Sequence, residues 1–209
     1  DTGVHATAQV VHFDTSAQRR MRSWILGANA NLPPGVSVTW AQSVSEDFHA
    51  RFKAQSRQYR YVILNRMFRP ALLRDRVCWD HNPLEAEAMH AAAQALVGEH
   101  DFSAFRALAC QARHPVRTVH RLEVVRRGDL IYLDIEANAF LHHMVRNIAG
   151  TLIAIGRGDQ PVEWAGELLA GRDRSRSGIT APAGGLYFVK VSYPAQFGLP
   201  GETVLPWIG

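Results

Sequence analysis

The sequence has few of the residues that would indicate a disulfide-linked, zinc-binding or membrane-spanning protein. Its 209 residues include only two cysteines, Cys78 and Cys110, which lack the close spacing of a zinc site and are too few for a disulfide framework. No apolar run approaches the ~18 residues that a membrane helix requires. These absences predict a cytoplasmic protein in a reducing compartment, without a membrane partner.

Lysine is almost absent, although the chain is basic. Of the 23 Lys and Arg residues only Lys53 and Lys190 are lysine, so guanidinium groups carry nearly all the positive charge. Guanidinium groups bind phosphate bidentately and stack on bases, which favours a nucleic-acid partner. A coding bias towards Ala and Arg is the alternative explanation. The arginines cluster at 19–22, 66–76, 113–127 and 172–176, as expected for patches that follow a phosphate backbone.

The order of predicted elements indicates an α+β fold, mainly an antiparallel sheet with helices. Alternating or β-branched residues predict strands at 6–13, 36–44, 58–65, 118–125, 130–137 and 185–193. Helical spacing of apolar residues predicts helices at 16–31, 84–97, 141–155 and 162–169. Gly128-Asp129 provides the turn of a hairpin. Because the strict βαβ rhythm of a parallel sheet is absent, the strands are expected to pair mainly antiparallel.

Two stretches place a charged residue beside apolar elements. Asp1 and Gly3 form a turn ahead of the first predicted strand, and a carboxylate in such a turn is a common place for catalysis. Arg146 follows Val145 by about 100° around an apolar helix. An Arg in that position needs an anion or water, although a solvated Arg at a helix edge is the alternative.

Four patterns occur in series along nearly the whole chain. They are DTGVHA at 1–6 with QVVHF at 9–13, DFHARF at 47–52 with RQYRY at 57–61, NAFLHHMVRN at 138–147, and Gly185-Leu186-Tyr187. Each is weak alone, but together they are specific, and with them the chain resembles the tRNA pseudouridine synthase family of the TruA type.

The resemblance implies a pseudouridine synthase fold, in which two α/β halves flank a central RNA-binding cleft. The chain would be a single catalytic unit, 1–209, of an incomplete N-terminal lobe, about 1–100, and a C-terminal lobe, about 101–209. It would act as a homodimer on tRNA without metal or cofactor, converting uridines of the anticodon stem-loop, tRNA positions 38–40, to pseudouridine. The family has Gly-Arg-Thr before the aspartate, so the chain is expected to be an N-terminally truncated synthase.

The resemblance also implies roles for four residues of this chain. Asp1 matches the catalytic aspartate that acts as nucleophile on a flipped uridine, and Arg146 matches the basic residue that pairs with it. Such a cation keeps the carboxylate ionised and oriented. Tyr59 matches the aromatic that packs on the target base, and Leu186 matches an apolar residue of the base pocket. Contacts of this kind contribute ~1–3 kcal/mol per base.

Two other classes of protein fit parts of the sequence. A metal-dependent hydrolase would need several histidines to converge, but none has the HxxxH spacing, and His142 and His143 on one helix would point about 100° apart. No metal site is therefore expected. The second alternative is an inactive, truncated fragment that binds RNA through its arginines without chemistry.

Overall fold

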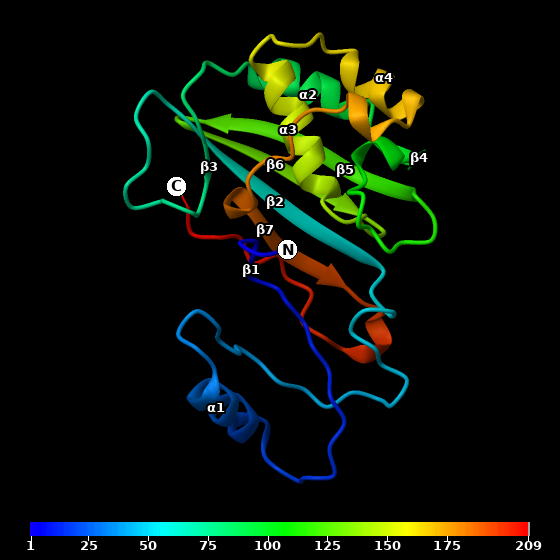
Figure 1. Cartoon of the computed structure of the whole chain (residues 1–209). Helices are drawn as coiled ribbons and strands as arrows, with labels where there is room; N and C mark the ends of the chain where they lie inside the picture. The colour runs from blue at the N-terminus through cyan, green and yellow to red at the C-terminus, as the bar shows by residue number, and fades with distance from the viewer. Residues whose placement is uncertain (209) are drawn as a thin grey trace.

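The computed structural model describes residues 1–208, in which seven strands form one sheet (Figure 1). Along the sheet the order is β1-β7-β2-β6-β5-β4, and β3 pairs with β2. The strands are β1 (His5–Ala6), β2 (Ser56–Asn65), β3 (Cys78–Asp80), β4 (Gly98–Asp101), β5 (Val116–Arg127), β6 (Leu130–Ala137) and β7 (Leu186–Ser192). Only the β1–β7 and β2–β3 pairs are parallel, so the predicted α+β fold with a mainly antiparallel sheet is confirmed.

Three helices cover one face of this sheet (Figure 1). They are α2 (Ala86–Gln94), α3 (Met144–Gly156) and α4 (Trp164–Gly171). Residues of β6 alternate between the two faces, as the period of a strand requires. Ile131, Leu133 and Ile135 join the large apolar cluster beneath the helices, while Leu130 and Tyr132 join a smaller cluster on the other face. None of the helices in residues 1–208 is long and apolar enough to cross a membrane.

The centre of the sheet follows the sequence prediction closely. β2 lies between β6 and β7, and Tyr61 through Leu64 are all buried, because both faces of a central strand are covered. The predicted hairpin joins β5 and β6, and Gly128 supplies the positive φ of 57° that its turn requires. The strand predicted at 185–193 is β7.

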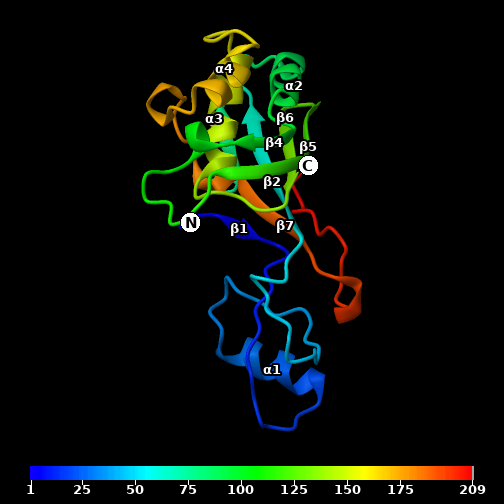
Figure 2. The same cartoon turned by 90° about the vertical axis from the view of Figure 1, so that its right-hand side faces the viewer.

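Residues 7–55 differ from the prediction. The strand expected at 6–13 is reduced to β1, and the strand expected at 36–44 does not form. The alternation was present, but a strand needs a neighbour to receive its backbone hydrogen bonds, and the extended 36–44 segment pairs with no strand among the described residues. The intervening helix, α1 (Met21–Asn31), buries none of its residues and lies apart from the sheet in both views (Figures 1 and 2). The division into lobes near residue 100 stays a prediction.

Gly150 allows a segment of the chain to cross α3 at close range. A Cβ at Gly150 would overlap the carbonyl oxygen of Ile179, and two residues further on Ala181 N donates to Arg146 O at 3.1 Å. The missing side chain therefore keeps the 178–182 segment against the helix turn that carries Arg146.

We expect Gly150→Ala to lower the free energy of unfolding by about 1–3 kcal/mol through overpacking against backbone. Thermal and urea denaturation measure the loss. The matched control is Gly166→Ala in α4, where the new methyl would meet Ala95 at an ordinary 3.5 Å and would favour the helix. Equal stabilities of the two variants would contradict the close crossing.

Candidate active site

The start of α3 is defined by a left-handed residue. His143 has φ 61° and ψ 5°, and the helix begins at Met144 rather than at the predicted Leu141. Met144 N donates to Leu141 O at 3.0 Å, which closes a tight turn before the helix. His142 and His143 thus precede the helix, and their rings lie with centroids 4.0 Å apart. The prediction that they point about 100° apart was wrong, because it assumed that both were helical.

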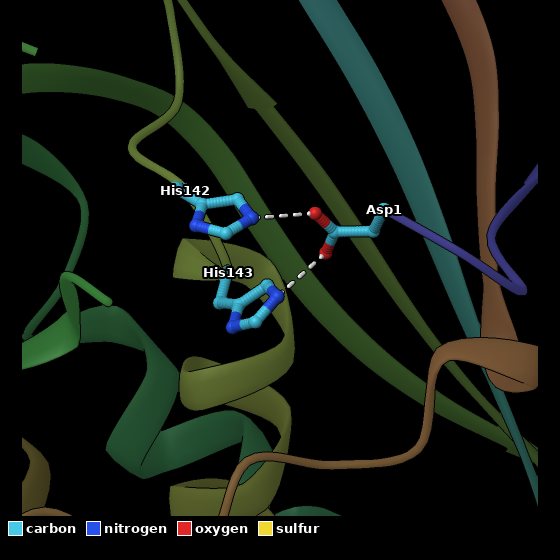
Figure 3. A group of neighbouring side chains, drawn as sticks. All are labelled: Asp1, His142 and His143. Carbon is cyan, nitrogen blue, oxygen red and sulfur yellow. Dashed lines mark ion pairs between the residues drawn. The ribbon is translucent and has the colours of Figure 1, made fainter. Parts of the chain in front are cut away.

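Asp1 lies against this turn, with its carboxylate facing both imidazoles (Figure 3). His142 Nε2 is 2.9 Å from Oδ1 of Asp1, and His143 Nε2 is 3.3 Å from Oδ2. The Asp1 side chain is only 14% exposed. The carboxylate of the chain's first residue is therefore enclosed by residues more than 140 positions away.

Arg146 provides the fixed positive charge of the site. One of its terminal nitrogens donates to Oδ2 of Asp1 at 3.2 Å, and its Nε donates to Ala181 O at 2.8 Å. The guanidinium side chain is 15% exposed, so this ion pair is screened less than a surface pair. The anion that the sequence required for Arg146 is Asp1.

Backbone geometry brings Asp1 to the helix. Val4 N donates to Asp1 O at 3.3 Å, and Gly3 between them has a φ of 84°, which strongly favours glycine. The chain then enters β1, whose His5 pairs with Tyr187 of β7 and whose ring stacks on that tyrosine at 4.8 Å. The turn around Gly3 therefore aims the aspartate from the sheet edge towards α3.

Tyr59 and Leu186 lie on the adjacent strands β2 and β7. The Tyr59 ring contacts Phe140 edge-on and Phe188 at a tilt, each with centroids 5.0 Å apart, and burial raises its pKa. Leu186 is 5% exposed and belongs to the large apolar cluster, against which Tyr59 and Val4 also pack. The structure brings both residues into the cluster that adjoins the Asp1 turn. Their contacts with a base stay predictions.

The two histidines are the site residues that the sequence argument did not assign. Burial lowers the pKa of His143, and the nearby positive charges lower it further. Both histidines lie within the motif at 138–147, which could have drawn attention to them, but only the turn at residue 143 makes the two rings converge on Asp1.

Ligand atoms of Asp1, His142 and His143 lie within 4.8 Å of one another and match the donor set of a transition-metal site. The Arg146 guanidinium on the same carboxylate opposes a second cation there.

Arginines also line a surface cavity next to the loop that contacts the turn at His142 and His143. The turn is linked to the 106–112 loop, because Ala107 N donates to His142 O at 3.0 Å. Arg106 anchors that loop by donating to the carbonyls of Cys110 and Ala112. The cavity has a volume of about 360 Å³ and is lined by Ser103, Arg106, Ala107, Leu108, Arg172, Asp173 and Arg174.

A mainly antiparallel sheet that presents one enclosed carboxylate to an arginine fits the class of pseudouridine synthases. The sequence model of a family described as tRNA pseudouridine synthase matches residues 92–194. Relatives named tRNA pseudouridine synthase A include proteins of Hydrogenovibrio crunogenus, 57% identical over 96% of this chain and 76% of the relative, and of Nitrosococcus oceani, 60% identical over 96% and 77%. A third, from Pseudomonas aeruginosa, is 55% identical over 99% of this chain and 72% of its own length.

The chain therefore belongs to the tRNA pseudouridine synthase A family, as the four motifs indicated. Membership makes it an isomerase, and it favours that class over a hydrolase or an RNA-binding protein without chemistry.

Proposed function

We propose that the protein converts uridine to pseudouridine in the anticodon stem-loop of tRNA, with Asp1 as the catalytic nucleophile. The observation that carries this proposal is the enclosed Asp1 carboxylate, which Arg146 contacts at 3.2 Å. A carboxylate paired in this way stays ionised and has a fixed direction, both of which a nucleophile requires.

The reaction is an isomerisation, so no atom is gained or lost overall. The bond between N1 of uracil and C1′ of ribose breaks, the base turns, and C5 forms a new bond to C1′. The proton leaves C5 and N1 gains one. Asp1 is the residue that acts on the extruded nucleotide, which must leave the base stack to reach an enclosed carboxylate.

Two groups of residues support the binding of such a substrate. Tyr59 and Leu186, at the apolar cluster beside the Asp1 turn, would pack against the extruded base. Arg172 at the surface cavity, whose side chain is 67% exposed, would contact a phosphate of the flanking RNA, whereas Arg106 and Arg174 there donate to groups of the protein itself. We infer that RNA lies in a cleft that includes both groups. The family resemblance also implies a cytoplasmic homodimer without a cofactor. Light scattering, which measures the molar mass of the protein in solution, tests whether it is a dimer.

The direct test is chemical mapping of pseudouridine in tRNA transcripts incubated with the protein expressed from its complete gene. We expect modification of uridines at positions 38–40 of the anticodon stem-loop, at the same rate with and without a metal chelator. Modification confined to other regions of the tRNA would overturn the assignment of the substrate site. Absence of pseudouridine would overturn the proposed activity.

A further inference from the structure

His143 differs from the other left-handed residues of the chain. Within residues 1–208 three residues other than glycine have positive φ: Asp75, His143 and Arg172. His143 is the one whose side chain reaches the Asp1 carboxylate, with Nε2 3.3 Å from Oδ2 (Figure 3). Left-handed backbone is unfavourable for a residue with a bulky side chain, and such residues cluster at functional sites.

The backbone at residue 143 does not explain why histidine stands there. Its carbonyl accepts the N–H of Asn147 at 2.9 Å, which begins the hydrogen bonding of α3. Glycine would provide the same carbonyl and would adopt φ 61° without strain. What histidine adds is the imidazole, and the structure directs it towards Asp1.

The surroundings of His143 keep its imidazole uncharged near neutral pH. Burial lowers its pKa, and three positive or ionisable groups on the elements around it lower it further: His142, Arg146 and Arg174. Asp1 is the negative group that faces it. A neutral imidazole has one N–H, and at Nε2, which lies 3.3 Å from Oδ2 without hydrogen-bond alignment in this structure, it would donate to Oδ2 without adding a charge once the contact shortens. Catalytic hydrogen bonds of this kind often tighten only when substrate is bound.

We propose that His143 is a positioning residue, which holds Oδ2 of Asp1 through Nε2 together with Arg146. This proposal rests on the proposed function of Asp1. His143 and Arg146 both contact Oδ2, whereas Oδ1 has a single neighbour, His142 at 2.9 Å, whose side chain is 42% exposed, so the substrate would reach Oδ1 by displacing that imidazole. Fixing one oxygen of a carboxylate sets the direction of the other.

The test is His143→Gly, which removes the imidazole but suits the left-handed backbone. We expect kcat for pseudouridine formation to fall about 10²-fold, as for a misplaced reacting group, with KM and tRNA affinity near wild type and the melting temperature not lowered. Because the His143 side chain is 29% exposed, free imidazole can enter the vacated space, and it should restore part of kcat. Rescue should increase as pH rises and more of the imidazole becomes neutral.

Asp75→Gly is the matched control, since it relieves a left-handed residue whose side chain is 87% exposed and should leave kcat unchanged. A second readout is independent of activity: in ¹⁵N-histidine NMR spectra, Asp1→Asn should shift the His143 Nε2 resonance. An unchanged kcat in His143→Gly with an active wild type, or an unshifted resonance, would overturn the positioning role. A wild type that makes no pseudouridine would instead overturn the proposed function, and the resonance still decides whether His143 holds Asp1.

Discussion

Replacing Asp1 with asparagine is expected to reduce pseudouridine formation by at least about 10⁴-fold, because the variant loses the group that acts on the extruded uridine. Asparagine has nearly the same shape as aspartate, so its amide oxygen can take the place of Oδ2 and still face Arg146 and His143, while its NH₂ group faces His142. Stability should therefore change by only about 1 kcal/mol, the scale of a single hydrogen bond. Single-turnover assays on a tRNA transcript measure the rate, and filter binding measures the affinity.

A control at a distant aspartate separates the loss of the catalytic carboxylate from the loss of one negative charge. The Asp159 side chain is 59% exposed, and its carboxylate has a weak ion pair with Arg157 at 4.0 Å. Asp159→Asn therefore makes the same carboxylate-to-amide change at the surface, away from the site. We expect wild-type rates from this control and unchanged tRNA affinity from both variants. If Asp1→Asn retained more than a small fraction of the wild-type rate, Asp1 would not be the nucleophile. A loss of affinity in Asp1→Asn alone would assign it to RNA binding instead.

The sequence predicted the central strands because their pattern determines their place. Alternation in β2 and the Gly128-Asp129 turn each specify a local structure that the sheet then completes. The pattern at 36–44 was equally strand-like, but strand formation depends on a neighbour that local sequence cannot provide. Residues 36–44 therefore show the limit of periodicity: it predicts which faces a strand would have, not whether the strand pairs.

The candidate site, like the sheet, was predictable only where a local pattern determined it. An Arg on an apolar helix needs an anion, and the motifs pointed to Asp1 as its partner, which the 3.2 Å contact fits. The convergence of His142 and His143 was not predictable from spacing, because one left-handed residue, with φ 61°, changes the direction of both rings. The same holds for Ala181 O, which reaches Arg146 from a segment with no periodic pattern.

Arg146→Ala is expected to lower the rate of pseudouridine formation by about 10²–10³-fold, or about 3–4 kcal/mol in activation free energy, because the partly buried Asp1 carboxylate loses its cation. The Asp1 carboxylate would remain enclosed by its neighbours but would lose the cation that stabilises its charged form and directs it. Ala181 O would also lose its donor, so the 178–182 segment should loosen. Single-turnover rates and hydrogen exchange at Ala181 N measure the two effects.

A second variant tests whether charge alone is sufficient. Arg146 contacts Ala181 O through Nε and Asp1 through a terminal nitrogen at the same time. Lysine has one nitrogen and cannot hold both positions, so Arg146→Lys should keep the charge but recover only part of the rate. Full recovery would show that the site needs a cation near Asp1 but not the planar guanidinium.

Arg157→Ala is the matched control, because it breaks an equivalent arginine–aspartate pair away from the site. Arg157 donates to Asp80 at 2.6 Å, and the Asp80 side chain is 2% exposed, so this variant leaves a buried carboxylate unpaired. It should lose stability by about 3–5 kcal/mol while its folded fraction keeps the wild-type rate. The two variants are therefore expected to differ: Arg157→Ala should lose mainly stability, and Arg146→Ala should lose mainly the rate of pseudouridine formation. A rate unchanged in Arg146→Ala would remove Arg146 from the mechanism, since its contact with Asp1 would then serve only to anchor the first turn of the chain.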